Sequence, residues 1–225
     1  MLVVRRIWVL LAVATALVLA LLVVPWVTSG ASGADAERCA RFELQSRARE
    51  RIVTGQGDRI VVIGDSYAVG LGLRKPRLSW PSALPGQVNV FAFSGSGFGA
   101  RASDCPAVSY AARAGRALRQ GADQVVVEGG LNDHDRPTRE VRAGFRALVA
   151  RLGDVPILVV GPPAAPDRVG AAHRVDALLR DESARAGVDY LSMTGEDLEY
   201  LDDGLHLTPA GHRAFGEVVA TALRH

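Results

Sequence analysis

The chain has 225 residues, of which 48% are hydrophobic, and its 26 basic and 24 acidic residues give a formal net charge of +2. This length suits one domain of ordinary size, and the apolar content is enough for a substantial core. Residues 37–225 alone carry 24 basic and 23 acidic residues. Such a balanced domain has no broad basic face, which argues against a nucleic-acid partner.

The N-terminal segment predicts export. Arg5 and Arg6 precede an apolar stretch of 21 residues, Ile7–Val27. Basic residues before such a stretch keep the N-terminus in the cytoplasm and place the rest of the chain outside. The length is typical of a membrane-spanning helix, whereas Ala34-Asp35-Ala36 resembles a signal-peptide cleavage site but lies about nine residues farther on. We expect residues 1–36 to be a signal peptide or, by preference, an uncleaved membrane anchor with a linker, and residues 37–225 to be the extracytoplasmic domain.

Short apolar runs then alternate with helical patterns, which predicts an α/β fold in one domain. Each run is short and apolar, as in a parallel sheet that is buried on both faces. The expected strands are Ile60–Ile63, Val88–Phe93, Gln124–Glu128, Pro156–Val160 and Val188–Leu191. The expected helices are Ala40–Gly55, Ala107–Arg119, Thr138–Leu152, Ala172–Ala186 and a last helix that Thr208-Pro209 opens and that ends near Arg224.

Two motifs hold the residue types of a serine hydrolase. Gly64-Asp65-Ser66 follows the first expected strand, and Asp203-Gly204-Leu205-His206 precedes the last helix. A serine hydroxyl needs a neutral imidazole to take its proton and a carboxylate to hold the imidazole in the right tautomer. Asp203 and His206 are three positions apart, so both side chains can point to one side of a turn. The alternative is a strand-ending turn and two solvated loop residues.

Candidate oxyanion donors follow two other strands. A glycine turn around Gly95 comes after the second expected strand, and Gly129-Gly130-Leu131-Asn132-Asp133 comes after the third. Backbone N–H groups of such turns and an Asn amide can stabilise the negative oxygen of a tetrahedral intermediate. Both segments lie at the carboxyl ends of strands, where ligands bind in open α/β sheets.

In their order and spacing, four segments resemble the blocks of the SGNH/GDSL hydrolase family, the GDSL-like lipases and acylhydrolases. These segments are Gly64-Asp65-Ser66, the turn at Gly95, Gly130-x-Asn132-Asp133 and Asp203-x-x-His206. The resemblance implies a flavodoxin-like three-layer α/β/α sandwich with a five-stranded parallel sheet. It also implies that Ser66 is the nucleophile, His206 the base and Asp203 its partner. The oxyanion hole would comprise the N–H groups of Ser66 and Gly95 and the amide of Asn132, with Gly97 or Gly99 as alternatives to Gly95.

Two other motif readings fit less well. The Gly-x-Ser-x-Gly elbow of α/β-hydrolases is absent, because Tyr67-Ala68 follows Ser66. Gly95-x-Gly97-x-x-Ala100 matches the dinucleotide-binding pattern, but it does not open a helix and no acidic residue ends the next strand at the required distance.

The two cysteines, Cys39 and Cys105, both follow the apolar stretch. An even number in an oxidising compartment favours a disulfide, worth about 4 kcal/mol in the chain-entropy model. The alternative is a pair of free buried thiols.

The sequence therefore predicts an exported serine esterase or acylhydrolase that works through an acyl-enzyme on Ser66. The expected substrate is a small-molecule, lipid or glycan ester, with no cofactor, no metal and no nucleic acid. An O-acyltransferase or polysaccharide O-deacetylase with the same triad is the first alternative. A non-catalytic binding module on the same fold is the second. Trp80-Pro81 resembles a pair that borders the substrate in this family, although a core tryptophan is an equal alternative.

Overall fold

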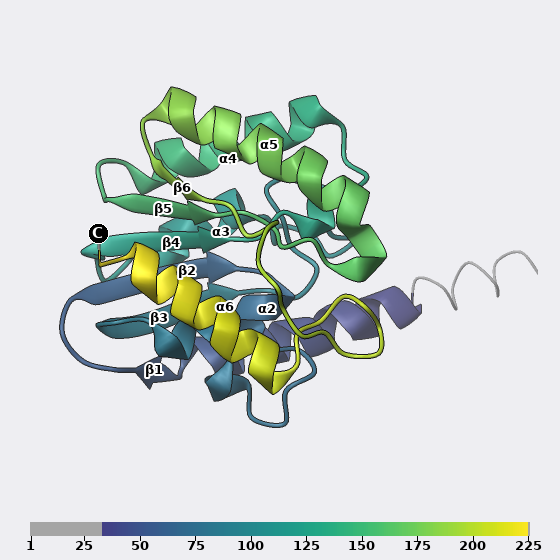
Figure 1. Cartoon of the computed structure of the whole chain (residues 1–225), viewed down its shortest axis with the longest axis horizontal. Helices are drawn as coiled ribbons and strands as arrows, with labels where there is room; N and C mark the ends of the chain where they lie inside the picture. The colour runs from purple at the N-terminus through teal and green to yellow at the C-terminus, as the bar shows by residue number, and fades with distance from the viewer. Residues whose placement is uncertain (1–32, 225) are drawn as a thin grey trace, which may run out of the picture. The chain divides into compact units, whose positions relative to one another are not determined.

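The computed structural model describes residues 33–224 (Figure 1). The chain divides into two units, Met1–Arg41 and Phe42–His225. The expected signal peptide or anchor, Ile7–Val27, lies outside the described residues and stays a prediction, as does the boundary at residue 36. Within residues 33–224, no helix is both long and apolar enough to cross a membrane.

Six strands form one sheet in the order β1-β3-β2-β4-β5-β6. Five of them run parallel and lie where the sequence predicts them: β2 (Arg59–Gly64), β3 (Gln87–Ala92), β4 (Gln124–Glu128), β5 (Ile157–Val160) and β6 (Asp189–Leu191). Counted along the chain, these five follow the flavodoxin order 2-1-3-4-5. The predicted α/β class and the parallel sheet are confirmed.

The sixth strand, β1 (Val53–Thr54), pairs antiparallel with β3 at the edge of the sheet. The prediction of a helix over Ala40–Gly55 is wrong at its end, because the helix covers residues 33–50. Two β-branched residues favour a strand here. Gly55 then turns the chain with φ +71°, and a Cβ there would lie 2.1 Å from the carbonyl oxygen of Gly86.

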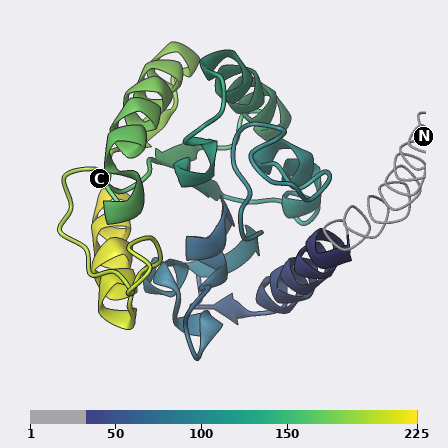
Figure 2. The same cartoon turned by 90° about the vertical axis from the view of Figure 1, so that its right-hand side faces the viewer.

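Helices cover both faces of the sheet (Figure 2). The short α2 (Ser66–Val69), the 3₁₀ turn η2 (Trp80–Ala83) and α6 (Pro209–Ala222) pack on one face. On the other face lie α3 (Tyr110–Ala117), α4 (Thr138–Leu152) and α5 (Val169–Ala186). Further 3₁₀ turns are η1 (Pro76–Leu78), η3 (Leu131–Asp133) and η4 (Pro166–Arg168). Neighbouring strand residues Val61 and Val62 enter opposite cores, as a sheet that is buried on both faces requires.

Caps explain where the helices begin. Thr208 caps α6, as predicted, because its hydroxyl accepts a hydrogen bond from the N–H of Gly211 at 3.1 Å. Ser109 caps α3 in the same way, so this helix starts later than the predicted Ala107. The structure agrees with the predicted ends of α4, while α5 starts three residues earlier than the predicted Ala172.

Both cysteines, Cys39 and Cys105, are disulfide-bonded, which confirms the predicted bridge. A structural disulfide is typical of proteins that work in an oxidising compartment.

Candidate active site

Ser66 stands at the sharp turn between β2 and α2. Asp65 caps α2, since its Oδ1 accepts the N–H of Tyr67 at 3.0 Å. Gly64 leaves no room for a side chain, because a Cβ there would lie 2.7 Å from Cβ of Ala68 and 2.8 Å from Oε2 of Glu128. The turn therefore holds Ser66 at the carboxyl end of a central strand, with 8% of its surface exposed.

Asp203 and His206 form a close pair. Asp203 Oδ2 lies 2.6 Å from His206 Nδ1, and Asp203 Oδ1 accepts the backbone N–H groups of Leu205 and His206 at 2.9 and 2.8 Å. Partial burial acts to raise the pKa of Asp203, but the hydrogen bonds from the His206 ring and from these N–H groups prevail and lower it to about 2. An ionised carboxylate at Nδ1 leaves Nε2 of a neutral imidazole as the proton acceptor.

Tyr67 joins the nucleophile turn to this loop. Its hydroxyl donates to the carbonyl of Leu205, and its ring centroid lies 6.4 Å from that of His206. The residue next to Ser66 thus contacts the loop that carries the imidazole. No hydrogen bond joins the side chains of Ser66 and His206, both of which the structure describes; a bond between a nucleophile and its base is often long or poorly aligned until substrate binds.

Asn132 lies in η3, directly after β4, and faces the nucleophile turn. Its Nδ2 donates to the carbonyl of Ser96 at 2.9 Å and to Oδ2 of Asp65 at 3.1 Å. Both amide protons are therefore in use, and Asn132 must release one of them before it can donate to an oxyanion. The amide brings the second and third predicted segments together with the first.

The glycine turn presents Gly95 with φ +82°, a conformation that favours glycine. Within residues 33–224, the N–H groups of Ser66 and Gly95 have no hydrogen-bond acceptor. The N–H of Gly99, by contrast, donates to Asp133 Oδ1 at 2.7 Å, and a Cβ at Gly97 would lie 2.5 Å from Asp133 Oδ2. Within the described residues, Gly95 and Gly97 therefore keep a free N–H group while Gly99 does not, and Gly95 is the one of the three with a positive φ.

Arg168 and Asp167, which the sequence did not single out, hold two parts of the site together. Arg168 Nη1 donates to the carbonyl of Leu131 at 2.9 Å and to Oδ1 of Asn132 at 3.4 Å. The N–H of Asp167 donates to the carbonyl of Gly204 at 3.0 Å. This segment links the Asn132 turn to the Asp203–His206 loop. Its only sequence signal was its place just after a parallel strand.

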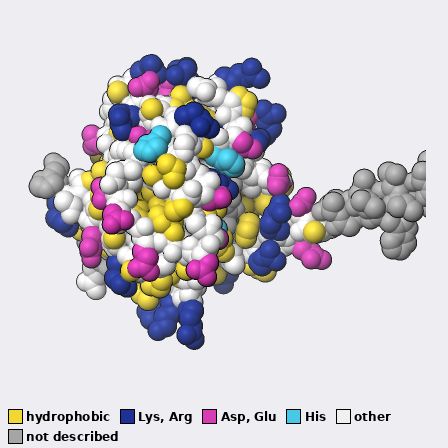
Figure 3. Space-filling model, turned by 45° about the vertical axis from the view of Figure 1, so that its right-hand side comes forward, with side chains coloured by type: hydrophobic (Ala, Val, Ile, Leu, Met, Phe, Trp, Pro, Cys, Tyr) yellow, Lys and Arg dark blue, Asp and Glu magenta, His cyan; other side chains and the backbone are white. Residues whose placement is uncertain are grey.

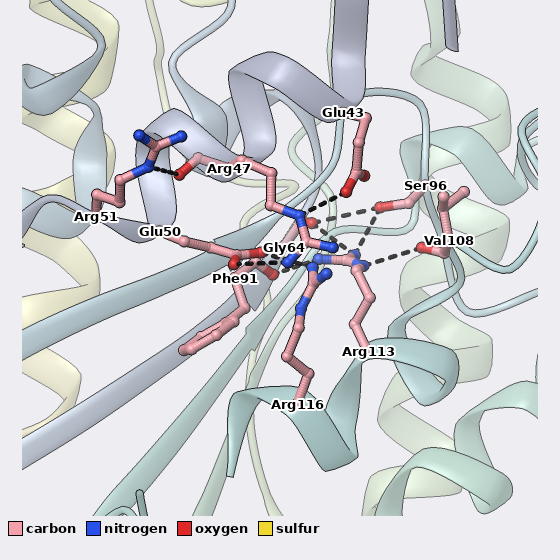
Figure 4. Close-up of polar contacts among 10 residues, drawn as sticks. All are labelled: Glu43, Arg47, Glu50, Arg51, Gly64, Phe91, Ser96, Val108, Arg113 and Arg116. Carbon is pink, nitrogen blue, oxygen red and sulfur yellow. Dashed lines mark hydrogen bonds and ion pairs between the residues drawn. The ribbon is translucent and has the colours of Figure 1, made fainter. Parts of the chain in front are cut away.

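Arg113 is buried next to Gly64, in the Ser66 turn, and Ser96, in the glycine turn at Gly95 (Figure 4). Its guanidinium donates to the carbonyl of Gly64 at 2.9 Å, to the hydroxyl of Ser96 at 2.8 Å and to the carbonyl of Val108 at 3.0 Å, and also to the carbonyl of Phe91. Burial lowers the pKa of Arg113 to about 10, so it stays charged at neutral pH. In the sequence, the feature that could have indicated this role is an arginine on the apolar face of a predicted helix.

Buried carboxyl groups lie around the Ser66 turn and the glycine turn at Gly95. Burial is the main cause that raises the pKa of Asp65 to about 6 and that of Asp133 to about 6, although backbone N–H groups act against it in both cases. Asp133 accepts the N–H groups of Phe98 and Gly99 and so anchors the glycine turn. Burial, together with the charge of Asp65, also raises the pKa of Glu128 well above its usual value.

Trp80 belongs to the core. Only 1% of its surface is exposed, and its ring packs 5.2 Å from that of Phe215. Its backbone N–H donates to Nδ1 of the buried His212 at 3.4 Å, and burial lowers the pKa of this imidazole to about 4. These contacts agree with the core interpretation of the tryptophan.

Metal ligands do not gather in the described part of the chain. Across residues 33–224, no three His, Cys, Asp or Glu side chains lie close enough to hold a metal ion.

The face at the carboxyl ends of the strands carries histidine side chains next to exposed hydrophobic ones (Figure 3). A hydroxyl, an imidazole–carboxylate pair and two free backbone donors at one end of a sheet are the parts needed for acyl transfer to a serine.

The chain is similar to a known protein family and to several solved structures. The sequence model of the GDSL-like lipase/acylhydrolase family matches residues 62–214. An aryl esterase from M. smegmatis has a similar structure, with a TM-score of 0.63 and 19% identity over 75% of this chain and 99% of that one. The corresponding values are 0.62, 17%, 75% and 99% for a carbohydrate acetylesterase from Sinorhizobium meliloti. They are 0.60, 23%, 75% and 99% for a putative arylesterase from Agrobacterium tumefaciens. No curated protein sequence matches the chain.

Proposed function

The chain belongs to the GDSL-like lipase/acylhydrolase family and is a serine hydrolase that acts on esters, and we propose that Ser66 is its nucleophile, with His206 as the base and Asp203 as the partner of His206. The observation that carries this assignment is the 2.6 Å contact between Asp203 and His206. Tyr67, which follows Ser66, contacts the same loop. A carboxylate that fixes the imidazole tautomer beside a strand-end serine suits a nucleophile–base pair.

The reaction would run through an acyl-enzyme. His206 Nε2 takes the proton of Ser66 as Oγ attacks the ester carbonyl, and the carbonyl oxygen becomes an oxyanion that the N–H groups of Ser66 and Gly95 stabilise. The imidazolium then gives its proton to the leaving alcohol. In deacylation His206 activates a water, which releases the acid and restores Ser66.

Asn132 would join the oxyanion hole by exchange. Of its two donated bonds, the one to Asp65 is longer, at 3.1 Å, than the one to Ser96, at 2.9 Å. When substrate binds, we expect the Asn132 amide proton that is donated to Asp65 to be donated to the oxyanion instead. The second amide proton stays hydrogen-bonded to the carbonyl of Ser96 and keeps the glycine turn in place.

Export and substrate class are also part of the proposal. The disulfide supports an extracytoplasmic location, and the apolar stretch Ile7–Val27 supports a signal peptide or an anchor. The similar solved proteins are described as aryl and carbohydrate acetyl esterases. From these descriptions we propose that the substrates of this chain are short acyl esters of aromatic alcohols or sugars.

A second candidate function uses the same acyl-enzyme. An O-acyltransferase would pass the acyl group to a sugar hydroxyl, and a polysaccharide O-deacetylase would remove it with water. The described similarity to a carbohydrate acetylesterase favours the deacetylase of the two.

The test uses the full-length protein with a fluorophosphonate probe, and mass spectrometry locates the modified residue. Hydrolysis of p-nitrophenyl acetate, a long-chain p-nitrophenyl ester and an acetylated xylo-oligosaccharide is followed in parallel. We expect label on Ser66 and turnover of the acetyl esters. Label without turnover would indicate a transferase that needs its acceptor, and a folded protein without label would contradict the assignment of Ser66.

A further inference from the structure

A cavity of about 580 Å³ lies at the edge of the sheet, away from Ser66. Its floor is Asn89 and Phe91 of β3, and its walls come from the helix that ends at residue 50 and from the end of α3. Arg59, at its rim, begins β2, whereas Ser66 follows the other end of this strand. The lining residues are Arg47, Glu50, Arg51, Arg59, Asn89, Phe91, Arg116, Ala117, Arg119 and Gln120.

The charge of this lining is strongly one-sided, with five arginines and one glutamate. Glu50 pairs with Arg116 at 2.6 Å and lies 3.7 Å from Arg47, which also pairs with Glu43 at 2.6 Å, outside the cavity (Figure 4). These two carboxylates therefore serve two of the five guanidinium groups.

The other three arginines have no such partner. Within residues 33–224, no carboxylate lies within 4.0 Å of a guanidinium nitrogen of Arg51, Arg59 or Arg119. The nearby carboxylate of Asp123 accepts the backbone N–H of Arg59 at 2.7 Å instead. Like charges that are gathered without counter-charges repel, and a bound anion relieves this repulsion.

Polar atoms of the lining are also left without partners. Nε of Arg59 and Nε of Arg116 are buried and have no hydrogen-bond acceptor in the described chain, and Oδ1 of the buried Asn89 has no donor. Most buried polar groups in proteins are paired, and each exception asks for an explanation. Small rotations of these arginines toward a bound anion would give their donors a partner.

We propose that this cavity is a binding site for a small multivalent oxyanion, a ligand that carries two or more phosphate or carboxylate groups. A guanidinium group matches either kind of group with two parallel hydrogen bonds. Three unpaired arginines select for more than one acid group on the ligand, and the volume is in the range of small-molecule sites. The site is separate from the esterase centre and does not depend on it.

Isothermal titration calorimetry of the full-length protein at low salt tests this proposal. The three probes are inorganic phosphate, pyrophosphate and trigalacturonate. We expect one equivalent of the probe with two phosphate groups or three carboxylates to bind. It should bind more tightly than inorganic phosphate, and its affinity should fall as the salt concentration rises. Tighter binding of pyrophosphate would identify phosphate groups as the preferred ligand, and tighter binding of trigalacturonate would identify carboxylates.

The double variant Arg59→Gln/Arg119→Gln removes two unpaired charges and breaks no ion pair, so we expect the fold to persist and the affinity to fall by about tenfold or more. The control Arg139→Gln changes an exposed arginine of α4 outside the cavity, and it should bind as the wild type does. Esterase activity should be unchanged in all variants, which separates this site from Ser66.

Equal binding by the double variant and the wild type would overturn the proposal. So would an equal loss in Arg139→Gln, which would show that general surface charge attracts the probe. Absence of binding at low salt by a folded wild-type protein would overturn it as well. If Arg59→Gln perturbs folding, the exposed pair Arg51→Gln/Arg119→Gln carries the same expectations.

Discussion

The two halves of the candidate active site are held in different ways. The Asp203–His206 pair is positioned by hydrogen bonds within four consecutive residues, and 47% of the Asp203 side chain is exposed. The Ser66 turn is positioned by groups from distant segments, among them the buried Arg113 and the half-buried Asn132. A local loop can be recognised from its motif, whereas a buried network exists only after the chain has folded.

The energetic consequences differ as well. Loss of one member of a buried network leaves its partners without hydrogen bonds, which costs more free energy than the bond itself contributes. Loss of one partner in an exposed loop lets water take its place. Changes in the loop should therefore affect chemistry more than stability, and changes in the network should affect both.

The largest effect is expected in the exposed pair. Asp203→Asn should lower kcat by about 10⁴-fold, because an amide at Nδ1 favours the wrong imidazole tautomer. His206→Ala should lose at least as much. The midpoint of thermal unfolding should stay near that of the wild type, since both side chains are partly exposed to water. Hydrolysis of p-nitrophenyl acetate and a melting curve measure both quantities, and an Asp203→Asn enzyme with wild-type turnover would remove Asp203 from the triad.

The buried network should respond in stability. Arg113→Met removes the hydrogen bonds that the guanidinium donates to three carbonyls and to the hydroxyl of Ser96, and we expect the free energy of unfolding to fall by about 3–5 kcal/mol. Urea unfolding measures this free energy. Arg139→Met, on the exposed face of α4, is the control and should change it by less than about 0.5 kcal/mol. Similar values for both variants would mean that the buried guanidinium is not what holds the strand ends.

Asn132 belongs to both halves, because its amide holds the network and is expected to turn to the oxyanion. Asn132→Ala should cost about 2.7–4 kcal/mol of transition-state stabilisation, seen in kcat with little change in KM. A loss of unfolding free energy with unchanged kcat would show that Asn132 only supports Asp65 and Ser96.

A fall in pH should change the free energy of unfolding in opposite directions through the two halves of the site. Between about pH 4 and pH 6 the folded protein keeps protons on Asp65 and Asp133, whose pKa values are raised to about 6, while the unfolded chain has lost them. The folded state is therefore stabilised as the pH falls through this window, by about 1 kcal/mol per pH unit for each group. Asp203, with its pKa lowered to about 2, instead contributes stability above pH 4 that is lost as the pH falls through 2.

Urea unfolding from pH 4 to pH 7 measures the first of these effects. Asp133→Asn removes one titrating group and should make the slope shallower. An unaltered slope in this variant would contradict the raised pKa of Asp133.

The smallest effect is expected at the contact between the two halves. Tyr67→Phe removes one hydrogen bond to Leu205, worth about 0.5–1.5 kcal/mol, and should lower kcat by up to about tenfold as the His206 loop loses its support. Tyr190→Phe is the matched control, since it removes a 2.7 Å bond to Asp176 outside the candidate site. It should affect stability alone, and an equal loss of kcat in both variants would argue against a positioning role for Tyr67.

Elements with local signals could be predicted from the sequence. Apolar runs marked the five parallel strands, Thr208-Pro209 marked the start of α6, and the Asp203–His206 spacing anticipated the hydrogen-bonded loop. Hydrophobic periodicity, capping and turn chemistry act over a few residues, so one sequence is enough to read them.

Other features of the fold and the site depend on contacts between distant parts of the chain. Strand β1 has only two residues and exists because β3 offers it an edge. Arg113 and Arg168 looked like ordinary helix and loop residues until folding placed Gly64, Ser96 and Asn132 around them. The use of both amide protons of Asn132 likewise depends on two segments far away in the chain. Burial and partners brought together over long sequence separations set these contacts, and no local pattern encodes them.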